Sequence, residues 1–192
     1  SLGLDPARFV VLVTAGAEAA RGMRSWTRAI VNSAADVDVV AICGRDERLR
    51  EDLARLAVRS PGRLVVTGFV DNIADWLRSA DVLVTKAGPG TIAEATSCGT
   101  PMLLAGHLRG QETGNTEIVA RAGAGRAVHG RRELLSQIED LRADPARVGR
   151  MRAAAARLGR PTAAAEIADL LARQARVQRG TRSPRDPRKE SR

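Results

Sequence analysis

The chain has 192 residues, of which 44% are hydrophobic and 28% are charged, a composition typical of one globular domain with a sizeable core. Only 2% of the residues are aromatic and none is tyrosine, so Ala, Val, Leu and Ile must build that core. The formal net charge is +9, but residues 176–192 hold seven basic and two acidic side chains, more than half of this excess. The scattered remaining charge and the scarcity of aromatic residues argue against nucleic-acid binding.

The two cysteines, Cys43 and Cys98, stand apart, with neither a C-x-x-C spacing nor a nearby histidine. We expect both to be small buried residues of a protein in a reducing compartment. No apolar run approaches the roughly 20 residues that span a bilayer, and the start of the chain does not resemble a signal peptide. The expected location is the cytoplasm, with peripheral attachment to the inner face of the membrane as an option.

Short apolar runs alternate with longer stretches of helical periodicity, the pattern of a parallel sheet covered on both faces. Strands are predicted at 9–14, 38–43, 64–67, 82–85, 101–105 and 125–128. Helices are predicted at 24–34, 46–58, 72–79, 91–98, 111–122, 131–141, 146–158 and 162–178. This alternation predicts an α/β fold, a Rossmann-like doubly wound parallel sheet.

The chain is expected to have three segments. Residues 1–8 read as a lead of the interdomain type, and 9–178 as the Rossmann-like domain. Residues 179–192 form a basic tail that contains Pro184 and Pro187 and is expected to be disordered. The tail is either a solvated end or a weak anchor on anionic lipid headgroups.

The predicted strand 82–85 runs into a glycine-containing turn, Lys86-Ala87-Gly88-Pro89-Gly90, followed by a helix. Gly88 and Gly90 would let the backbone approach a ligand closely, and the helix N-terminus would favour a diphosphate. Thr91 and Glu94 also fit a capping box, in which both side chains bond to the first N–H groups of the helix. Spacing alone leaves both interpretations open.

The predicted strand 101–105 is followed by a second polar stretch, which contains His107, Gln111, Glu112 and Asn115. Amide and carboxylate side chains at this edge could read the hydroxyl groups of a sugar. The alternative is an ordinary polar helix N-terminus in which Glu112 complements the helix dipole. Asp36-Val37-Asp38 spells D-x-D, a spacing that holds a metal ion in some enzymes, but it precedes a strand, so we do not expect it to bind a metal.

Three motifs together are similar to the C-terminal domain of family 28-type glycosyltransferases: T-K-A-G-P-G-T-I-A-E-A at 85–95, C-G-T-P-M-L-L at 98–104 and G-Q-E-T-G-N at 110–115. T-G-F-V-D-N-I-A-D-W-L-R-S-A-D at 67–81 and A-G-A-G at 122–125 continue the match, which covers roughly residues 2–175. The branch that the chain most resembles contains monogalactosyldiacylglycerol synthases and processive diacylglycerol glucosyltransferases. The resemblance implies one half of a GT-B fold, namely the donor-binding domain.

The resemblance also implies a role for nine residues that match donor-binding positions of the family: Phe69 and Val70 for the uracil ring, Gly88, Gly90 and Thr91 for the diphosphate, Glu94 for the ribose, and Gln111, Glu112 and Asn115 for the sugar.

One stretch departs from the family pattern. The glycine-rich loop expected after the first strand is Ala15-Gly16-Ala17-Glu18-Ala19 in this chain. Each alanine adds a Cβ where the backbone would approach the ligand or the facing domain. Gly16 and Glu18 are therefore doubtful donor contacts, and a weakened or altered enzyme is compatible with this sequence.

The expected function is that of a hexosyltransferase donor domain, which binds a UDP-sugar for transfer to a lipid acceptor such as diacylglycerol, without a metal or other cofactor. The family pattern puts the catalytic base in an N-terminal acceptor domain, so His107 is only a weak candidate for that role. We expect this chain alone to bind the donor without transferring it and to need an acceptor domain or a separate partner chain. The alternatives are a peptidoglycan-type UDP-N-acetylglucosamine transferase, a UDP-sugar epimerase, and a non-catalytic nucleotide-sugar-binding module or donor subunit.

Overall fold

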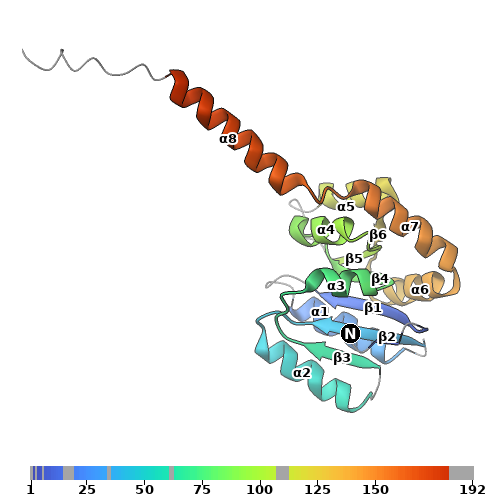
Figure 1. Ribbon diagram of the computed structural model, residues 1–192. Helices are drawn as coiled ribbons and strands as arrows, with labels where there is room; N and C mark the ends of the chain where they lie inside the picture. The colour runs from blue at the N-terminus through green and yellow to red at the C-terminus, as the bar shows by residue number, and fades with distance from the viewer. Residues whose placement is uncertain are drawn as a thin grey trace, which may run out of the picture. The chain divides into compact units, whose positions relative to one another are not determined.

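The computed structural model describes residues 2, 4–5, 7–14, 20–33, 36–60, 63–106 and 113–181. It divides into two compact units, residues 1–159 and 160–192. The first unit contains a six-stranded parallel sheet flanked by helices on both faces (Figure 1), which confirms the predicted Rossmann-like α/β fold.

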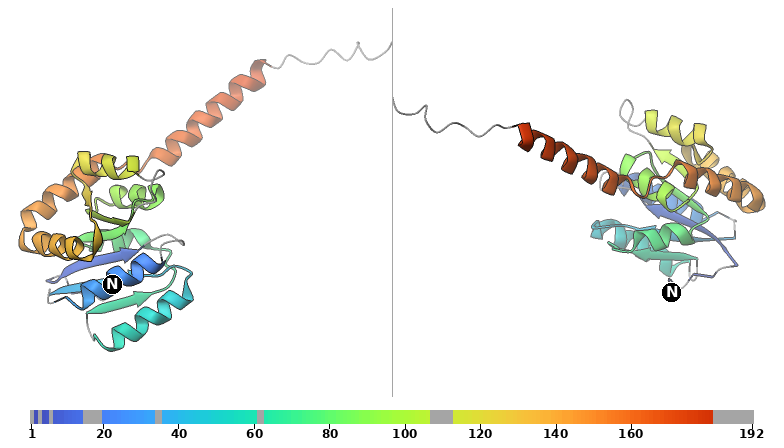
Figure 2. Two further views of the ribbon diagram at one scale, coloured as in Figure 1. Left: turned by 180° about the vertical axis from the view of Figure 1, so that it is seen from behind. Right: turned by 45° about the horizontal axis from the view of Figure 1, so that its top comes forward.

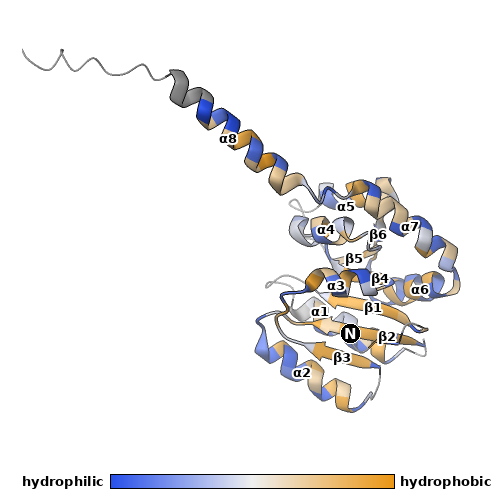
Figure 3. Cartoon of the chain, in the orientation of Figure 1, coloured by the Kyte–Doolittle hydropathy of each residue, from blue (hydrophilic) through white to orange (hydrophobic). Residues whose placement is uncertain are grey.

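Four strands form the largely apolar, buried middle of the sheet, whereas the two strands at its edges contain exposed residues, Val65 and Arg126. The strands are β1 (Phe9–Thr14), β2 (Val37–Ile42), β3 (Leu64–Thr67), β4 (Val82–Lys86), β5 (Met102–Gly106) and β6 (Gly125–Ala127). They correspond to the six predicted strands, with ends that differ by one residue at most. Figure 3 shows that hydrophobic residues dominate the strands, as a sheet covered on both faces requires.

Seven helices of the first unit and one of the second follow the predicted order. They are α1 (Ala20–Val31), α2 (Glu47–Val58), α3 (Ile73–Ser79), α4 (Pro89–Ser97), α5 (Thr113–Ala122), α6 (Gly130–Ala143), α7 (Pro145–Leu158) and α8 (Ala163–Thr181). Helices α1, α2 and α6 build the core on one face of the sheet, and α3, α4 and α5 build it on the other (Figure 2). Helix α7 contributes to both cores, through Val148 and Met151 on one side and Ala154 and Ala155 on the other.

The strand order β3-β2-β1-β4-β5-β6 places a topological switch point between β1 and β4. Strand β1 pairs in parallel with β2 on one side and with β4 on the other. From this point the chain winds outward in both directions, so a crevice opens beyond the carboxyl ends of the strands. Ligands of open α/β sheets bind at such a crevice. We therefore expect a ligand site at the segments that follow β2, β3, β4 and β5.

Two helices begin at least two residues earlier than the sequence pattern predicts. Helix α1 begins at Ala20 rather than at residue 24, and α4 begins at Pro89 rather than at Thr91. Gly88 is the N-cap of α4, and Pro89 occupies the first helical position. A proline suits this position because its fixed φ is helical and its missing N–H would have no partner in the helix. The Gly-Pro-Gly sequence thus starts the helix instead of forming a loop before it.

Helix α8 makes up the described part of the second unit. Its exposed large apolar side chains are Ile167, Leu170 and Leu171. The helix continues to Thr181, which is three residues beyond the predicted end, and the rest of the predicted tail lies outside the described residues. Among the described residues, no helix is both long enough and apolar enough to cross a membrane.

Candidate functional site

The turn between β4 and α4 is held against the end of β5. The Ala87 N–H donates to the Gly106 carbonyl oxygen at 3.0 Å, and the Gly88 N–H donates to the Lys86 carbonyl oxygen at 2.8 Å. The pairing of β4 with β5 shifts register between Thr85 and Lys86. These bonds fix where α4 begins, at the carboxyl edge of the sheet and beside the switch point.

The first turn of α4 offers N–H groups that lack acceptors within the helix, as the first turn of every helix does. Gly88, the N-cap residue, has no side chain that could accept hydrogen bonds from them. Gly90, the second residue of α4, is exposed. Apart from the adjacent residues and the backbone of its own helix, no described residue has an atom within 4 Å of the position that a Cβ would take. Its φ is not positive, in contrast to the φ of +59° at Gly44. Backbone conformation thus does not require glycine at this position, whereas a ligand close to the backbone would.

The capping-box interpretation of Thr91 and Glu94 is wrong. A capping box needs its Thr at the N-cap, but Gly88 is the N-cap of α4 and Thr91 lies inside the first turn. Glu94 is exposed, and its side chain has no hydrogen bond or ion pair with any other residue that the structure describes. Its carboxylate is therefore available to a ligand.

Asn115 connects the two predicted ligand loops. It lies in the first turn of α5, and its Nδ2 donates to the Ala87 carbonyl oxygen at 3.0 Å. Asn115 is half-buried, so this bond is partly shielded from water. The side chain thus holds the β4–α4 turn in place, a role that the sequence pattern does not reveal. A contact between Asn115 and a donor sugar stays a prediction.

The segment after β3 presents one exposed aromatic residue. Phe69 is 66% exposed, whereas Val70 is half-buried and packs against the core under α3 and α4. The guanidinium carbon of Arg45, which follows β2, lies 5.2 Å from the centroid of the Phe69 ring. Arg45 could not be predicted as a neighbour of Phe69, because nothing in the local sequence pattern links it to a residue 24 positions away.

Several predicted site residues lie outside the described residues, namely Gly16, Glu18, His107, Gln111 and Glu112. Their roles stay predictions. The other histidine, His129, is the N-cap of α6, and its backbone N–H donates to the Glu133 carboxylate at 2.7 Å. Cys43 is buried as expected, whereas Cys98 is only half-buried; both are free thiols. Burial raises the pKa of the Cys43 thiol to about 11.

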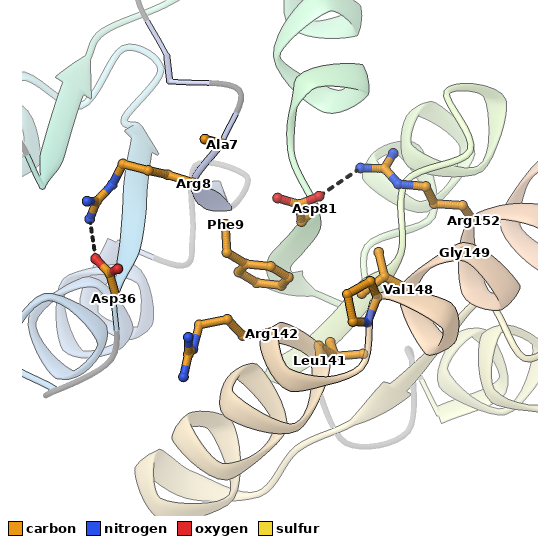
Figure 4. A pocket seen from close by; sticks show the side chains of 11 residues that line it. Ala7, Arg8, Phe9, Asp36, Asp81, Leu141, Arg142, Val148, Gly149 and Arg152 are labelled. Atoms are coloured by element: carbon orange, nitrogen blue, oxygen red, sulfur yellow. Dashed lines mark hydrogen bonds and ion pairs between the residues drawn. The ribbon is translucent and has the colours of Figure 1, made fainter.

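A cavity of about 520 Å³ lies at the opposite, amino edge of the sheet (Figure 4). Its charged side chains are paired with one another. Arg8 contacts Asp38 at 2.6 Å and Asp36 at 2.7 Å. The hydrogen bond to Asp38 raises the pKa of Arg8. Both carboxylates of the D-x-D sequence thus serve an ion pair that joins β1 to β2.

Asp81 completes the paired charges of this cavity. One of its carboxylate oxygens accepts from the Val10 N–H at 2.8 Å, and the other lies 3.4 Å from Arg152. This cavity is on the far side of the sheet from the carboxyl edge, and its polar groups hold strand β1 in place. In the part of the chain that the structure describes, no cluster of three or more His, Cys, Asp or Glu side chains has the arrangement of a metal site.

Comparison with known proteins agrees with this geometry. Residues 10–170 match the family described as the Glycosyltransferase family 28 C-terminal domain. Monogalactosyldiacylglycerol synthase 1 of Arabidopsis thaliana is 33% identical over 146 residues, which are 72% of this chain and 27% of that protein. Processive diacylglycerol beta-glucosyltransferase of Bacillus licheniformis is 30% identical over 150 residues, which are 78% of this chain and 39% of that protein. The chain thus spans well under half the length of these relatives.

Solved structures show the same fold. MurG of Acinetobacter baumannii has a TM-score of 0.71 at 19% identity, over 86% of this chain and 52% of that one. MnaA of Staphylococcus aureus, solved with UDP, has a TM-score of 0.59 at 17% identity, over 76% of this chain and 39% of that one. At these identities the likeness establishes the architecture and leaves the ligand of this chain to be argued from its own residues.

Proposed function

The chain belongs to the glycosyltransferase family 28 C-terminal domain family, and from this premise we propose that it is the donor-binding half of a GT-B hexosyltransferase. Its ligand would be a UDP-sugar, bound at the carboxyl edge of the sheet beside the switch point. The curated relatives are longer, so the complete enzyme requires an acceptor domain, either as a further domain or as a separate chain.

The start of α4 is the observation that carries this proposal. Its uncapped N–H groups and positive dipole end favour a diphosphate, and the open space outside Gly90 lets a phosphate approach the backbone. The same groups would stabilise the departing nucleoside diphosphate during transfer, since negative charge develops on it. Catalysis by this route needs no obligatory metal.

The remaining donor contacts follow from their positions around this helix. Glu94, one turn further along α4, is exposed and unpaired among the described residues, as an acceptor for two ribose hydroxyls should be. Phe69 and Val70 would hold the uracil ring at the end of β3. Gln111, Glu112 and Asn115 would face the sugar from the start of α5.

We propose a lipid acceptor such as diacylglycerol, because the relatives at about 30% identity are named for that substrate. The peptidoglycan-type transferase and epimerase alternatives have weaker support, from structural likeness at 25% identity or less to proteins that include a UDP-N-acetylglucosamine 2-epimerase of Listeria monocytogenes. The catalytic base would lie in the acceptor half, so this chain alone would bind a donor without turning it over. The proposed location is the cytoplasm, peripheral to the membrane that holds the acceptor.

The decisive test is thermal stabilisation of the purified chain by UDP, UDP-glucose, UDP-galactose, UDP-N-acetylglucosamine and GDP-mannose. A ligand present at about 100 times its dissociation constant adds about 2.7 kcal/mol to the free energy of unfolding, which is readily measured. Stabilisation by UDP and its sugars, and not by GDP-mannose, is expected. A lack of response to all five ligands would contradict the proposal.

Glu94→Gln sharpens the test, because it removes the charge from the ribose position without a large change in shape. Charge-assisted hydrogen bonds contribute about 1.5–3 kcal/mol, so UDP affinity should fall by about 10- to 150-fold. Glu51→Gln, which removes an exposed carboxylate from α2, is the matched control and should leave affinity unchanged. Equal affinities of the two variants would remove Glu94 from the site.

A further inference from the structure

Phe69 is an unusual residue in this chain. It is one of two phenylalanines among 192 residues, and the chain contains no tyrosine. Phe69 is nevertheless 66% exposed. Burying a phenylalanine side chain stabilises a protein by about 1.5–3 kcal/mol, so this aromatic ring forgoes a gain that folding could have used. A ligand that covers the ring would recover it.

Arg45 covers part of this ring, and the backbone fixes its position. It follows Gly44, whose φ of +59° makes the tight turn out of β2. The next residue, Asp46, caps α2 by accepting a hydrogen bond from the Leu49 N–H at 2.9 Å. Arg45 is thus held between a glycine turn and a helix cap.

The segments that carry Arg45 and Phe69 are also held to each other. The Cys43 N–H donates to the Thr67 carbonyl oxygen at 2.9 Å, which extends the pairing of β2 and β3 to the base of both segments. A Cβ on Gly68 would lie 3.5 Å from the Gly44 carbonyl oxygen, so the two turns are in van der Waals contact. The approach of Arg45 to Phe69 therefore follows from the sheet and the two turns.

The geometry limits how a base can use this pair. The guanidinium carbon lies 5.2 Å from the ring centroid, which is too close for a base to lie between the two groups. Arg45 occupies one face of the ring, so the exposed fraction lies on the other face and the edges. A base that stacks on the open face would complete three layers, in the order guanidinium, phenyl ring and base.

We propose that Arg45 is a positioning residue for the nucleobase of the donor, acting through Phe69. This inference rests on the proposed function, since it assumes a nucleotide at the carboxyl edge. The cation fixes the orientation of an exposed ring that would otherwise rotate freely about its side-chain bonds. The ring in turn presents a preformed stacking surface, so less order has to be imposed when the nucleotide binds.

The test measures the dissociation constant of UDP by titration calorimetry in a double-mutant cycle. Arg45→Met removes the cation at similar length and should weaken UDP binding about two- to fivefold, the size of an exposed cation–π contact. Phe69→Leu should weaken it about 5- to 150-fold, as expected for the loss of base stacking. In the Phe69→Leu background, Arg45→Met should have no further effect. Arg45→Lys keeps a cation over the ring and should restore most of the affinity.

Arg48→Met is the matched control, because it removes an equal, exposed charge from the first turn of α2, three residues after Arg45. It should leave UDP affinity unchanged, and thermal unfolding should be unaltered in all the variants at position 45. The inference is overturned if Arg45→Met has no effect on UDP binding, or an equal effect with and without the Phe69 ring. A wild-type chain that binds no UDP would overturn the proposed function itself and this inference with it.

Discussion

Replacing Gly90 with alanine should change folding and binding in opposite directions. Gly90 lies in the first turn of α4 with a helical φ, and no residue that the structure describes outside this helix has an atom within 4 Å of an added Cβ. Alanine restricts the unfolded chain more than glycine, so Gly90→Ala should raise the free energy of unfolding by about 0.5–1 kcal/mol. The same methyl group would occupy the space that the diphosphate needs. Overpacking of this kind costs about 1–3 kcal/mol, so UDP affinity should fall by about 5- to 150-fold.

Urea denaturation and titration calorimetry with UDP measure the two effects separately. Gly149→Ala is the matched control, because Gly149 lies in α7 at the amino edge and also has open space around an added Cβ. It should stabilise the fold by about 1 kcal/mol without changing UDP affinity. If Gly90→Ala bound UDP as tightly as the wild type, the diphosphate would not approach the start of α4, and the placement of the donor would be refuted.

The further predictions concern the core and the cysteine thiols. A Cβ on Gly125 would overlap the Met102 carbonyl oxygen. Gly125→Ala should therefore lower the free energy of unfolding, measured by urea denaturation, by about 1–3 kcal/mol. An unchanged urea midpoint would show that β5 and β6 can separate without a loss of stability. Because burial raises the pKa of the folded Cys43 thiol to about 11, the unfolded chain loses this proton first and stability should decline as pH rises from about 9 toward 11. A Cys43→Ala variant should lose this part of the pH dependence, and at pH 8 a thiol reagent should label the half-buried Cys98 faster than Cys43.

The sheet could be predicted from the sequence because its determinants are local. A strand buried on both faces needs a continuous apolar run, and such runs occur where the inner strands β1, β2, β4 and β5 lie. The strand order was not predicted, because apolar runs do not indicate which strands pair with each other. The α4 start was missed because Gly88-Pro89-Gly90 fits a turn and a helix N-terminus equally well by composition.

Candidate site residues were predicted only where a short sequence motif matches the family pattern. The resemblance assigned Glu94 and Gly90 to the donor, but spacing also suggested a capping box, and only the position of the N-cap at Gly88 removed that alternative. The contact partners of Asn115 and Arg45 could not be predicted from the sequence. Asn115 bonds to a carbonyl oxygen 28 residues away, and the Arg45 contact bridges the ends of two strands.

The sequence by itself determined the fold class and the family, and it predicted the edge of the sheet at which we propose a ligand, because apolar periodicity and short motifs are properties of contiguous residues. Only the tertiary structure decided which polar groups satisfy one another and which stay available. Arg8 neutralises the D-x-D carboxylates across two strands, whereas Glu94 is left unpaired among the described residues. Such pairing depends on contacts between distant segments, and these contacts exist only once the chain has folded.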